Sequence, residues 1–357
     1  MLFIAVHGGA GNHPTDKGVE SQIRKGLRDA CVAAQNNFQN NQDPCQAVRD
    51  SIIELENNPH FNAGTGSNLT VSGTVECDAS IMNSSEDFGA VGAISGTKNP
   101  IKAAYNILIG SQHSDPHGRI PPMLLVGSSS HPTTDASEMI TPRARSEWER
   151  WKTIIRIDQT PKEMISDSIV QDTVGAIACT IDGEVSAGVS RWDLTPKSDF
   201  LTPILGPSGG ILLKPIGRIG EAACFGAGCW ASGGRDSLNA VACSISGAGE
   251  MIMRAFLAKE LAEAVRRPDC DTHEEIERSL TKFKDMCAQR GSEHANAGVI
   301  LLVLERSEDV DLKPRLWCGF TTNSFAVAYA ASIEIDYTSE AESRPRQARA
   351  LHYVSPS

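Results

Sequence analysis

Thr173 follows Asp172 and opens an apolar run at residues 174–179, at the end of a long polar stretch. A threonine hydroxyl becomes a useful nucleophile when a base takes its proton. If the chain is cut before Thr173, the freed α-amine lies on the same residue and has a pKa of about 7.7–8.0. The position predicts either a threonine that simply begins a buried strand or one that is released by cleavage and uses its own amine as the base.

Three loops of small residues offer groups that could stabilise negative charge beside such a threonine. Ser246 and Gly247 lie where a predicted helix begins. Either Ser246 or Gly249 caps that helix, or a hydroxyl and a backbone N–H turn toward an oxyanion. Asn62 lies in a tight loop that is either a hairpin or the position of another oxyanion donor. Residues 7–11 are glycine-rich and either form a permissive turn or bring the backbone, at Gly9, against a substrate.

Arg218 stands between Gly217 and Gly220 in an otherwise apolar stretch. Most arginines are solvated, but a guanidinium in this setting is suited to binding a carboxylate with two parallel hydrogen bonds. Residues 226–231 look like a dinucleotide-binding fingerprint. They lack the acidic residue about 20 positions on in a strand–helix–strand context, so we do not expect a nucleotide site there.

Composition narrows the class of protein. The 357 residues are 40% hydrophobic and 22% charged, which is enough to build a large core, and the net charge is −11. This charge argues against nucleic acid or an anionic membrane as the main partner. The apolar start, residues 1–6, predicts a buried strand rather than a signal peptide. The ten cysteines show no Cys-x-x-Cys pair, which favours reduced thiols in an intracellular protein over disulfides or a zinc site.

Hydrophobic periodicity predicts a mixed fold in which sheets pack face to face between helices. The connection at residues 128–170 is long and polar, and so is expected to be functional. The predicted helices span residues 18–37, 44–57, 100–110, 145–155, 249–265 and 272–290, and the predicted strands span residues 1–6, 123–127, 173–180, 184–190, 297–305 and 325–333.

These segments, in this order, resemble the Thr-type asparaginase and aspartylglucosaminidase family of N-terminal-nucleophile hydrolases. The resemblance covers most of the chain, and so many motifs in one order are a specific signal. The matching segments are residues 7–11 and 55–66, Asp78-Ala79-Ser80-Ile81-Met82, Lys98-Asn99-Pro100, Asp172-Thr173-Val174-Gly175-Ala176, Ser208-Gly209-Gly210, Gly217-Arg218-Ile219-Gly220 and Ser246-Gly247.

The resemblance implies catalytic roles for five residues. Thr173 is the nucleophile, and Ser208 supplies the hydroxyl that orients it. Ser246 and the N–H of Gly247 form the oxyanion hole, and Asn62 supports the site from the first half of the chain.

A substrate pocket is implied as well. Arg218 binds a substrate carboxylate, and Gly9 lies in the same pocket. Glu221 stands where asparaginases carry the aspartate that grips a substrate amine. No cofactor is expected to be required, and no metal ligands are assigned, although the loop at residues 55–65 resembles one that binds a structural monovalent cation through backbone carbonyls.

The implied fold is α+β, a four-layer αββα sandwich. Cleavage between Asp172 and Thr173 would yield an α segment, residues 1–172 with a pro-loop at about 128–172, and a β segment, residues 173–357. The two segments form one composite domain, and they are expected to assemble as an αβ heterodimer or its dimer.

Within the family the chain is most similar to the taspases, or threonine aspartases. Asp172 precedes the nucleophile, where plain asparaginases carry glycine. We therefore predict a threonine endopeptidase that cleaves itself and then cuts protein substrates after aspartate, and the resemblance implies nuclear transcription regulators among them. The other taspase-like features are Asn68 after Gly66-Ser67, Gly118-Arg119-Ile120-Pro121-Pro122 and Gly228-Cys229-Trp230-Ala231.

Two departures keep other functions open. Residues 191–207 separate Ser190 from Ser208, which are almost adjacent in the family, so the insertion either bulges outward or displaces Ser208. Glu221 could still bind an ammonium. The alternatives are an L-asparaginase or isoaspartyl peptidase acting on small molecules, and an uncut pseudoenzyme serving as a scaffold. We expect an intracellular protein, cytoplasmic or nuclear, that binds neither nucleic acid directly nor a membrane.

Overall fold

The computed structural model describes residues 1–11, 13, 16–127, 136–157, 173–191, 213–235, 238–267, 269–292, 295–306, 312–331 and 349–351. Asp172, Ser208 and residues 192–207 of the insertion lie outside these ranges, so the predictions made for them are not addressed by the structure. No helix among the described residues is both long enough and apolar enough to cross a membrane.

The larger of two main sheets has eight strands and carries Thr173 at its centre. Strand β6 lies between β1 and β7, and every pairing in this sheet is antiparallel except that of β4 with β5. In order across the sheet the strands are β14 (Arg349–Leu351), β13 (Ser324–Ala331), β1 (Leu2–Gly11), β6 (Val174–Thr180), β7 (Val185–Arg191), β3 (Cys77–Asn83), β4 (Phe88–Ile94) and β5 (Leu124–Val126).

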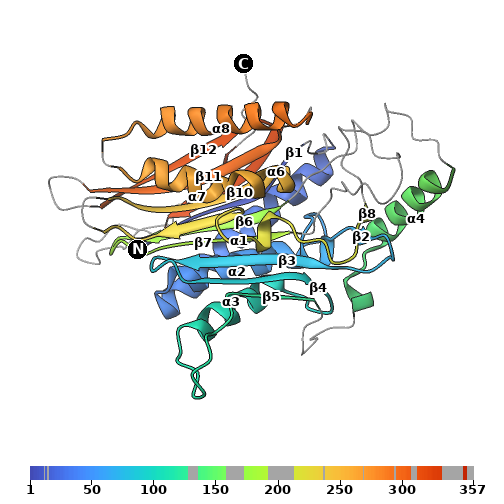
Figure 1. Ribbon diagram of the computed structural model, residues 1–357, viewed down its shortest axis with the longest axis horizontal. Coiled ribbons are helices and arrows are strands. Elements are labelled where there is room, and N and C mark those ends of the chain that lie inside the picture. The colour runs from blue at the N-terminus through green and yellow to red at the C-terminus, as the bar shows by residue number, and fades with distance from the viewer. Residues whose placement is uncertain are drawn as a thin grey trace, which may run out of the picture.

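Three helices cover one face of this sheet (Figure 1). They are α1 (Lys17–Asn41), α2 (Pro44–Asn57) and α3 (Pro100–Ser111). Asp16 caps α1 by accepting hydrogen bonds from two backbone N–H groups, and Asp43 caps α2, whose first residue is a proline. The predicted helices at residues 18–37, 44–57 and 100–110 are therefore confirmed, and α1 is longer at its C-terminal end than expected.

The smaller sheet has four strands and packs on the opposite face of the larger one (Figure 1). Helices α6 (Gly249–Ala255), α7 (Leu257–Val265) and α8 (Thr272–Gln289) cover its outer side. The prediction of a single helix at residues 249–265 is wrong, because Phe256 has a φ of 47° and divides the segment into two helices. The strand order is β12 (Leu312–Phe320), β11 (Ala297–Arg306), β10 (Ala240–Gly247) and β9 (Cys229–Ser232).

The central strands are buried on both faces, which explains their unbroken apolar sequences. Along β6, Ile177 faces the core between the two sheets, while Ala176 and Ala178 face helices α1 to α3. The chain is thus a mixed α+β protein with two main sheets and helices on the outer side of each. All ten cysteines lie in described segments and are free thiols, of which Cys318 is exposed.

Two segments differ from the sequence prediction. Residues 7–11 are not a turn but the second half of β1, which continues past an irregularity in its pairing with β13 between His7 and Ala10. The polar connection contains α4 (Pro142–Ile157), which starts earlier than expected. Near it lies a separate two-stranded parallel sheet of β2 (Leu69–Thr70) and β8 (Leu213–Lys214) (Figure 1).

Candidate active site

Thr173 immediately precedes β6 and is almost completely buried, with 1% of its surface exposed. Its hydroxyl donates a hydrogen bond to Oε1 of Glu221, at an Oγ1–Oε1 distance of 2.9 Å. Glu221 is the first residue of the short 3-10 helix η3 (Glu221–Ala223) and has no exposed surface. The sequence-predicted nucleophile therefore lies against a buried carboxylate that the sequence reasoning had placed in the same pocket.

Arg191 is the partner of that carboxylate. It ends β7, lies opposite Asp78 of β3, and pairs through Nη1 with Oε2 of Glu221. Nη1 also donates to the backbone carbonyl of Gly247 at 3.1 Å. Gly249 closes over the pair, since a Cβ atom there would lie 2.2 Å from the Glu221 carboxylate.

In the sequence, Arg191 is recognised only as the first residue of the insertion at residues 191–207. A charged residue at the end of a strand that otherwise holds only small and apolar residues is the signal that could identify it.

Ser246 and Gly247 lie where strand β10 ends, beside this cluster. Ser246 Oγ accepts a hydrogen bond from the backbone N–H of Ala10 at 3.0 Å. The alternative that Ser246 caps a helix is wrong, because the residue before α6 is Ala248 and Ser246 is paired within the sheet. Gly247 has a φ of 148°, in the region that favours glycine, and a Cβ atom there would collide with the carbonyl of Asn296.

His7 and Ser244 form a second buried pair under the start of β6. Ser244 Oγ donates its only hydrogen to the carbonyl of Gly188 at 3.1 Å, so His7 Nε2, 2.9 Å away, must carry the hydrogen that joins the two side chains. Burial lowers the pKa of His7 to about 3, and a contact with the Thr173 backbone opposes this shift only in part. His7 is therefore neutral. Gly175 lacks a side chain because a Cβ atom would lie 2.2 Å from Ser244 Oγ.

Arg218 is bound by an acidic residue, Glu250. Its Nε and Nη2 donate to Oε1 of Glu250, at 3.0 and 2.8 Å, and Glu250 belongs to the first turn of α6. The Arg218 side chain is 10% exposed and that of Glu250 is 39% exposed. A substrate carboxylate that binds Arg218 must therefore share it with Glu250 or displace Glu250.

Asn62 lies in a loop and Gly9 lies in β1, and each makes a hydrogen bond within its own part of the chain. The Asn62 side-chain oxygen accepts from the N–H of Asn68 at 3.2 Å, which fixes its own loop. The carbonyl of Gly9 contacts Nε2 of His13 at 3.0 Å. Thr173 contacts Glu221, and Glu221 contacts Arg191, which also donates to the carbonyl of Gly247. The roles predicted for Asn62 and Gly9 stay predictions.

Glu56 lies in the last turn of α2, at the start of the segment at residues 55–65 that is predicted to bind a monovalent cation. Its Oε1 accepts from Ser190 Oγ at 2.7 Å and from the N–H of Ile101 at 2.9 Å. Burial raises the pKa of Glu56 to about 8 despite these hydrogen bonds. Within the described ranges, no three His, Cys, Asp or Glu side chains are grouped so as to hold a metal ion.

Comparison with known proteins places the chain in a family. The family model described as "Asparaginase" matches residues 1–302, most of the chain. The chain belongs to the asparaginase family. A plant-type L-asparaginase from Thermococcus kodakarensis is 33% identical over 300 residues, which cover 79% of this chain and 86% of the relative. An isoaspartyl peptidase/L-asparaginase from Xenopus laevis is 31% identical over 259 residues, covering 72% and 73%.

A third relative, the plant-type L-asparaginase of Pyrococcus furiosus, is 33% identical over 284 residues that cover 74% of this chain and 80% of its own. The predicted resemblance to the asparaginase family is thus confirmed, and the chain is an asparaginase-family hydrolase. The names of these relatives agree better with the alternative small-molecule activity than with the predicted taspase activity.

Proposed function

We propose that this chain is an L-asparaginase or isoaspartyl peptidase with Thr173 as its nucleophile. The observation that supports this most directly is the buried hydrogen bond from Thr173 Oγ1 to Glu221. A hydroxyl held by a carboxylate in a water-poor site has its hydrogen directed to one acceptor, and its lone pairs remain available to attack a carbonyl carbon.

Maturation comes first in this scheme. Thr173 Oγ attacks the carbonyl carbon of Asp172, the carbon–nitrogen bond breaks, and the nitrogen gains the hydroxyl proton to become the α-amine of Thr173. Water then hydrolyses the resulting ester, which releases the Asp172 carboxylate and restores the hydroxyl. In turnover the same oxygen attacks a substrate amide, the α-amine accepts the proton and passes it to the leaving amine, and water releases the product from the acyl ester.

Ser246 is the proposed donor to the oxyanion of both steps. The hydrogen bond from Ala10 uses a lone pair of Ser246 Oγ and leaves its own hydrogen for another acceptor. Donors fixed in a buried strand need no reorganisation as negative charge develops on the carbonyl oxygen. This agrees with the role predicted for Ser246 from the family resemblance, together with the N–H of Gly247.

Substrate recognition rests on opposite charges beside Thr173. Asparagine presents an ammonium and a carboxylate at its α-carbon. Glu221 is the proposed acceptor for the ammonium, and the guanidinium groups of Arg191 and Arg218 are the candidates for the carboxylate. The ammonium must compete with Arg191 for Glu221, so we expect substrate binding to rearrange that pair.

Endopeptidase cleavage after aspartate, as in a taspase, is the second candidate. Asp172 before the nucleophile supports it, because an aspartate must fit the site at least once during self-cleavage. The Arg191–Glu221 pair supports it too, since a neutralised Glu221 suits a substrate whose α-nitrogen is part of a peptide bond. Its substrates would be proteins, with transcription regulators implied only by the resemblance.

One assay series separates the candidates. Intact-mass measurement after prolonged incubation should give two fragments that meet at the Asp172–Thr173 bond. The Thr173→Ala variant should stay whole, and Thr173→Ser should still cut. The matured enzyme is then offered asparagine, a β-aspartyl dipeptide and a Val-Gln-Asp-Gly peptide. Ammonia or amine release from the first two supports our proposal, and cleavage of the peptide alone supports the taspase reading. A chain that stays uncut and inactive would favour the alternative of a pseudoenzyme that serves as a scaffold.

The remaining expectations form part of the same proposal. The helices outside each sheet support the four-layer αββα arrangement of a single composite domain. After cleavage, residues 1–172 and 173–357 would stay together as α and β subunits, because β1 of the first pairs with β6 of the second over six residues. Dimerisation of that unit, a cation at residues 55–65 and an intracellular location are proposed on the resemblance.

A further inference from the structure

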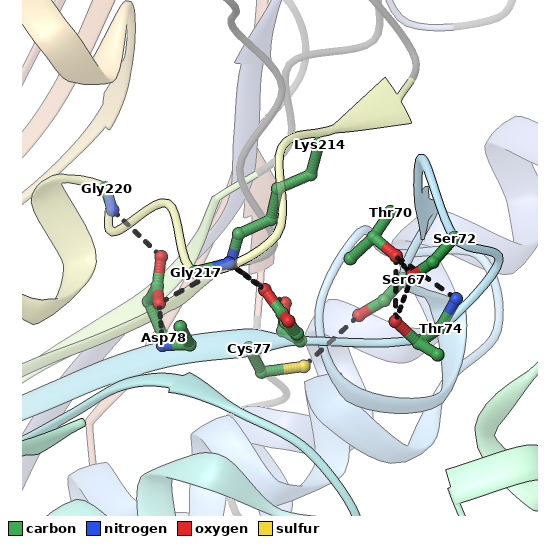
Figure 2. Close-up of polar contacts among 11 residues, drawn as sticks. Ser67, Thr70, Ser72, Thr74, Cys77, Asp78, Lys214, Gly217 and Gly220 are labelled. Carbon is green, nitrogen blue, oxygen red and sulfur yellow. Dashed lines mark hydrogen bonds and ion pairs between the residues drawn. The ribbon is translucent and has the colours of Figure 1, made fainter. Parts of the chain in front are cut away.

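A fully buried lysine lies at the base of the segment that leads to Glu221. Lys214 ends β8, and its side chain has no exposed surface. Its Nζ donates to the carbonyl of Glu76 at 3.3 Å and lies 3.8 Å from carboxylate oxygens of both Glu76 and Asp78 (Figure 2). An ammonium is rarely buried without such partners, because its charge must be compensated.

The two carboxylates hold the backbone that follows the lysine. Glu76 Oε2 accepts from the N–H of Gly217 at 2.9 Å, and Asp78 Oδ2 accepts from the N–H of Gly220 at 2.9 Å (Figure 2). The other oxygen of Asp78 accepts from the N–H of Ala93 at 2.7 Å, which anchors the side chain to β4. Residues 214–220 are therefore held against Glu76 and Asp78 at three positions, which are Lys214, Gly217 and Gly220.

Gly220, the last of these three positions, directly precedes Glu221, the hydrogen-bond partner of Thr173. Gly220 is the N-terminal cap of η3, and the next residue is Glu221, whose side chain accepts from Thr173. A carboxylate that must meet a hydroxyl at 2.9 Å depends on the position of its own backbone. Asp78 fixes that backbone one peptide bond away.

The charges explain why a lysine is needed. Two carboxylates and one ammonium give this cluster a formal charge of −1. Without the ammonium the charge becomes −2, and the two carboxylates repel each other with no cation between them. The hydrogen bonds that the carboxylates accept from Gly217 and Gly220 would then lose their present geometry.

We propose that Lys214 is a positioning residue, whose ammonium compensates the charges of Glu76 and Asp78 so that these carboxylates hold Glu221 against Thr173. This inference rests on the proposed role of Thr173 as a self-cleaving nucleophile. Its consequence is that the chemistry at Thr173 depends on a lysine that touches neither Thr173 nor Glu221.

The variants are chosen by charge. Lys214→Met removes the ammonium and should slow self-cleavage by on the order of tenfold or more, as expected when charged hydrogen bonds are weakened. The double variant K214M/E76Q returns the cluster to −1, and its glutamine still offers an oxygen to Gly217, so most of the rate should return. Lys25→Met, which breaks an exposed pair with Asp29 on α1, is the matched control and should cut at the wild-type rate.

A thermodynamic cycle with Glu221 separates positioning from general stability. If Lys214 acts through Glu221, Lys214→Met should add little to the loss already caused by Glu221→Gln, whereas a merely structural role would give multiplied losses. Rates are read as intact mass against time, and thermal melts identify unfolded variants. Should Lys214→Met fail to fold, Asp78→Asn in the same cycle takes its place.

The outcomes are distinct. Slower cutting by Lys214→Met, rescue by K214M/E76Q and non-additivity with Glu221→Gln support the inference. Wild-type cutting by folded Lys214→Met, or multiplied losses in the cycle, would overturn it while leaving Thr173 as the nucleophile. A wild-type chain that never cuts would overturn the proposed function and this inference with it.

Discussion

Replacing Glu221 by glutamine tests the contact on which the proposed function rests. The change keeps the size and an acceptor oxygen but removes the negative charge between Thr173 and Arg191. A hydrogen bond to a charged group contributes about 1.5–3 kcal/mol, and one between neutral groups about 0.5–1.5 kcal/mol. The difference, roughly 1–1.5 kcal/mol, corresponds to about a tenfold slower self-cleavage if it is felt in the transition state.

The same change also leaves the guanidinium of Arg191 buried without its carboxylate. Breaking a buried ion pair on one side costs about 3–5 kcal/mol of stability. The double variant R191M/E221Q removes both charges, so stability should return while self-cleavage stays slow. Glu20→Gln, which breaks a surface pair with Arg24 on α1, is the control, since such pairs contribute only about 0.2–0.5 kcal/mol.

The assay measures two quantities on the same samples. Intact mass against time gives the rate of cutting at Thr173, and thermal melts give the stability. The reasoning is refuted if Glu221→Gln cuts at the wild-type rate while remaining folded. It is also refuted if R191M/E221Q recovers both stability and rate, because Glu221 would then act only through the fold.

Four further predictions follow from other parts of the site. Ser246→Ala should lower turnover by on the order of 10²–10³ and should also lower stability by about 1–3 kcal/mol, because the buried N–H of Ala10 loses its acceptor. A cleaved variant with wild-type turnover would remove Ser246 from the oxyanion hole. Arg218→Ala should raise the KM for a substrate that carries a carboxylate more than it lowers kcat, and an unchanged KM would assign recognition to Arg191. Deleting residues 191–207 joins Ser190 to Ser208 and removes the Arg191 guanidinium, whereas deleting residues 192–207 keeps that guanidinium. Faster self-cleavage in the first deletion alone would show that Arg191 restrains the site. Wild-type rates of self-cleavage in both deletions would show that neither Arg191 nor the insertion restrains it. The folded-state pKa of His7, about 3, lies below the ordinary 6.5, so the contribution of neutral His7 to stability is full above pH 6.5 and is lost as the pH falls toward 3. Between pH 6.5 and 4, His7→Gln should therefore lose less stability than the wild type in denaturant titrations, by at most about 1.4 kcal/mol per pH unit. Parallel curves of stability against pH would contradict the assignment of His7 as a buried neutral side chain.

Local sequence determined most of the helices and the central strands. Proline and aspartate at residues 43–44 and apolar residues at three- and four-residue spacing define α2 within its observed bounds, because capping and periodicity depend on near neighbours in the chain. The apolar run after Thr173 likewise identified β6, and the ordered motifs identified the family. Where a local rule was used alone it sometimes failed: glycines at residues 8–11 suggested a turn, yet pairing with β13 extends the strand through them.

Only the tertiary structure decided which groups surround Thr173. Glu221 is 48 residues away from it along the chain, and His7 is 237 residues away from Ser244. Glycines flank Arg218 in the sequence, but its guanidinium is held by Glu250, while Arg191, which looked like the edge of an insertion, reaches the buried carboxylate. Periodicity encodes which face of an element is buried, but it carries no information on which element packs against that face or on the register between them. Those choices depend on the packing of whole sheets and on the need of each buried charge for a partner.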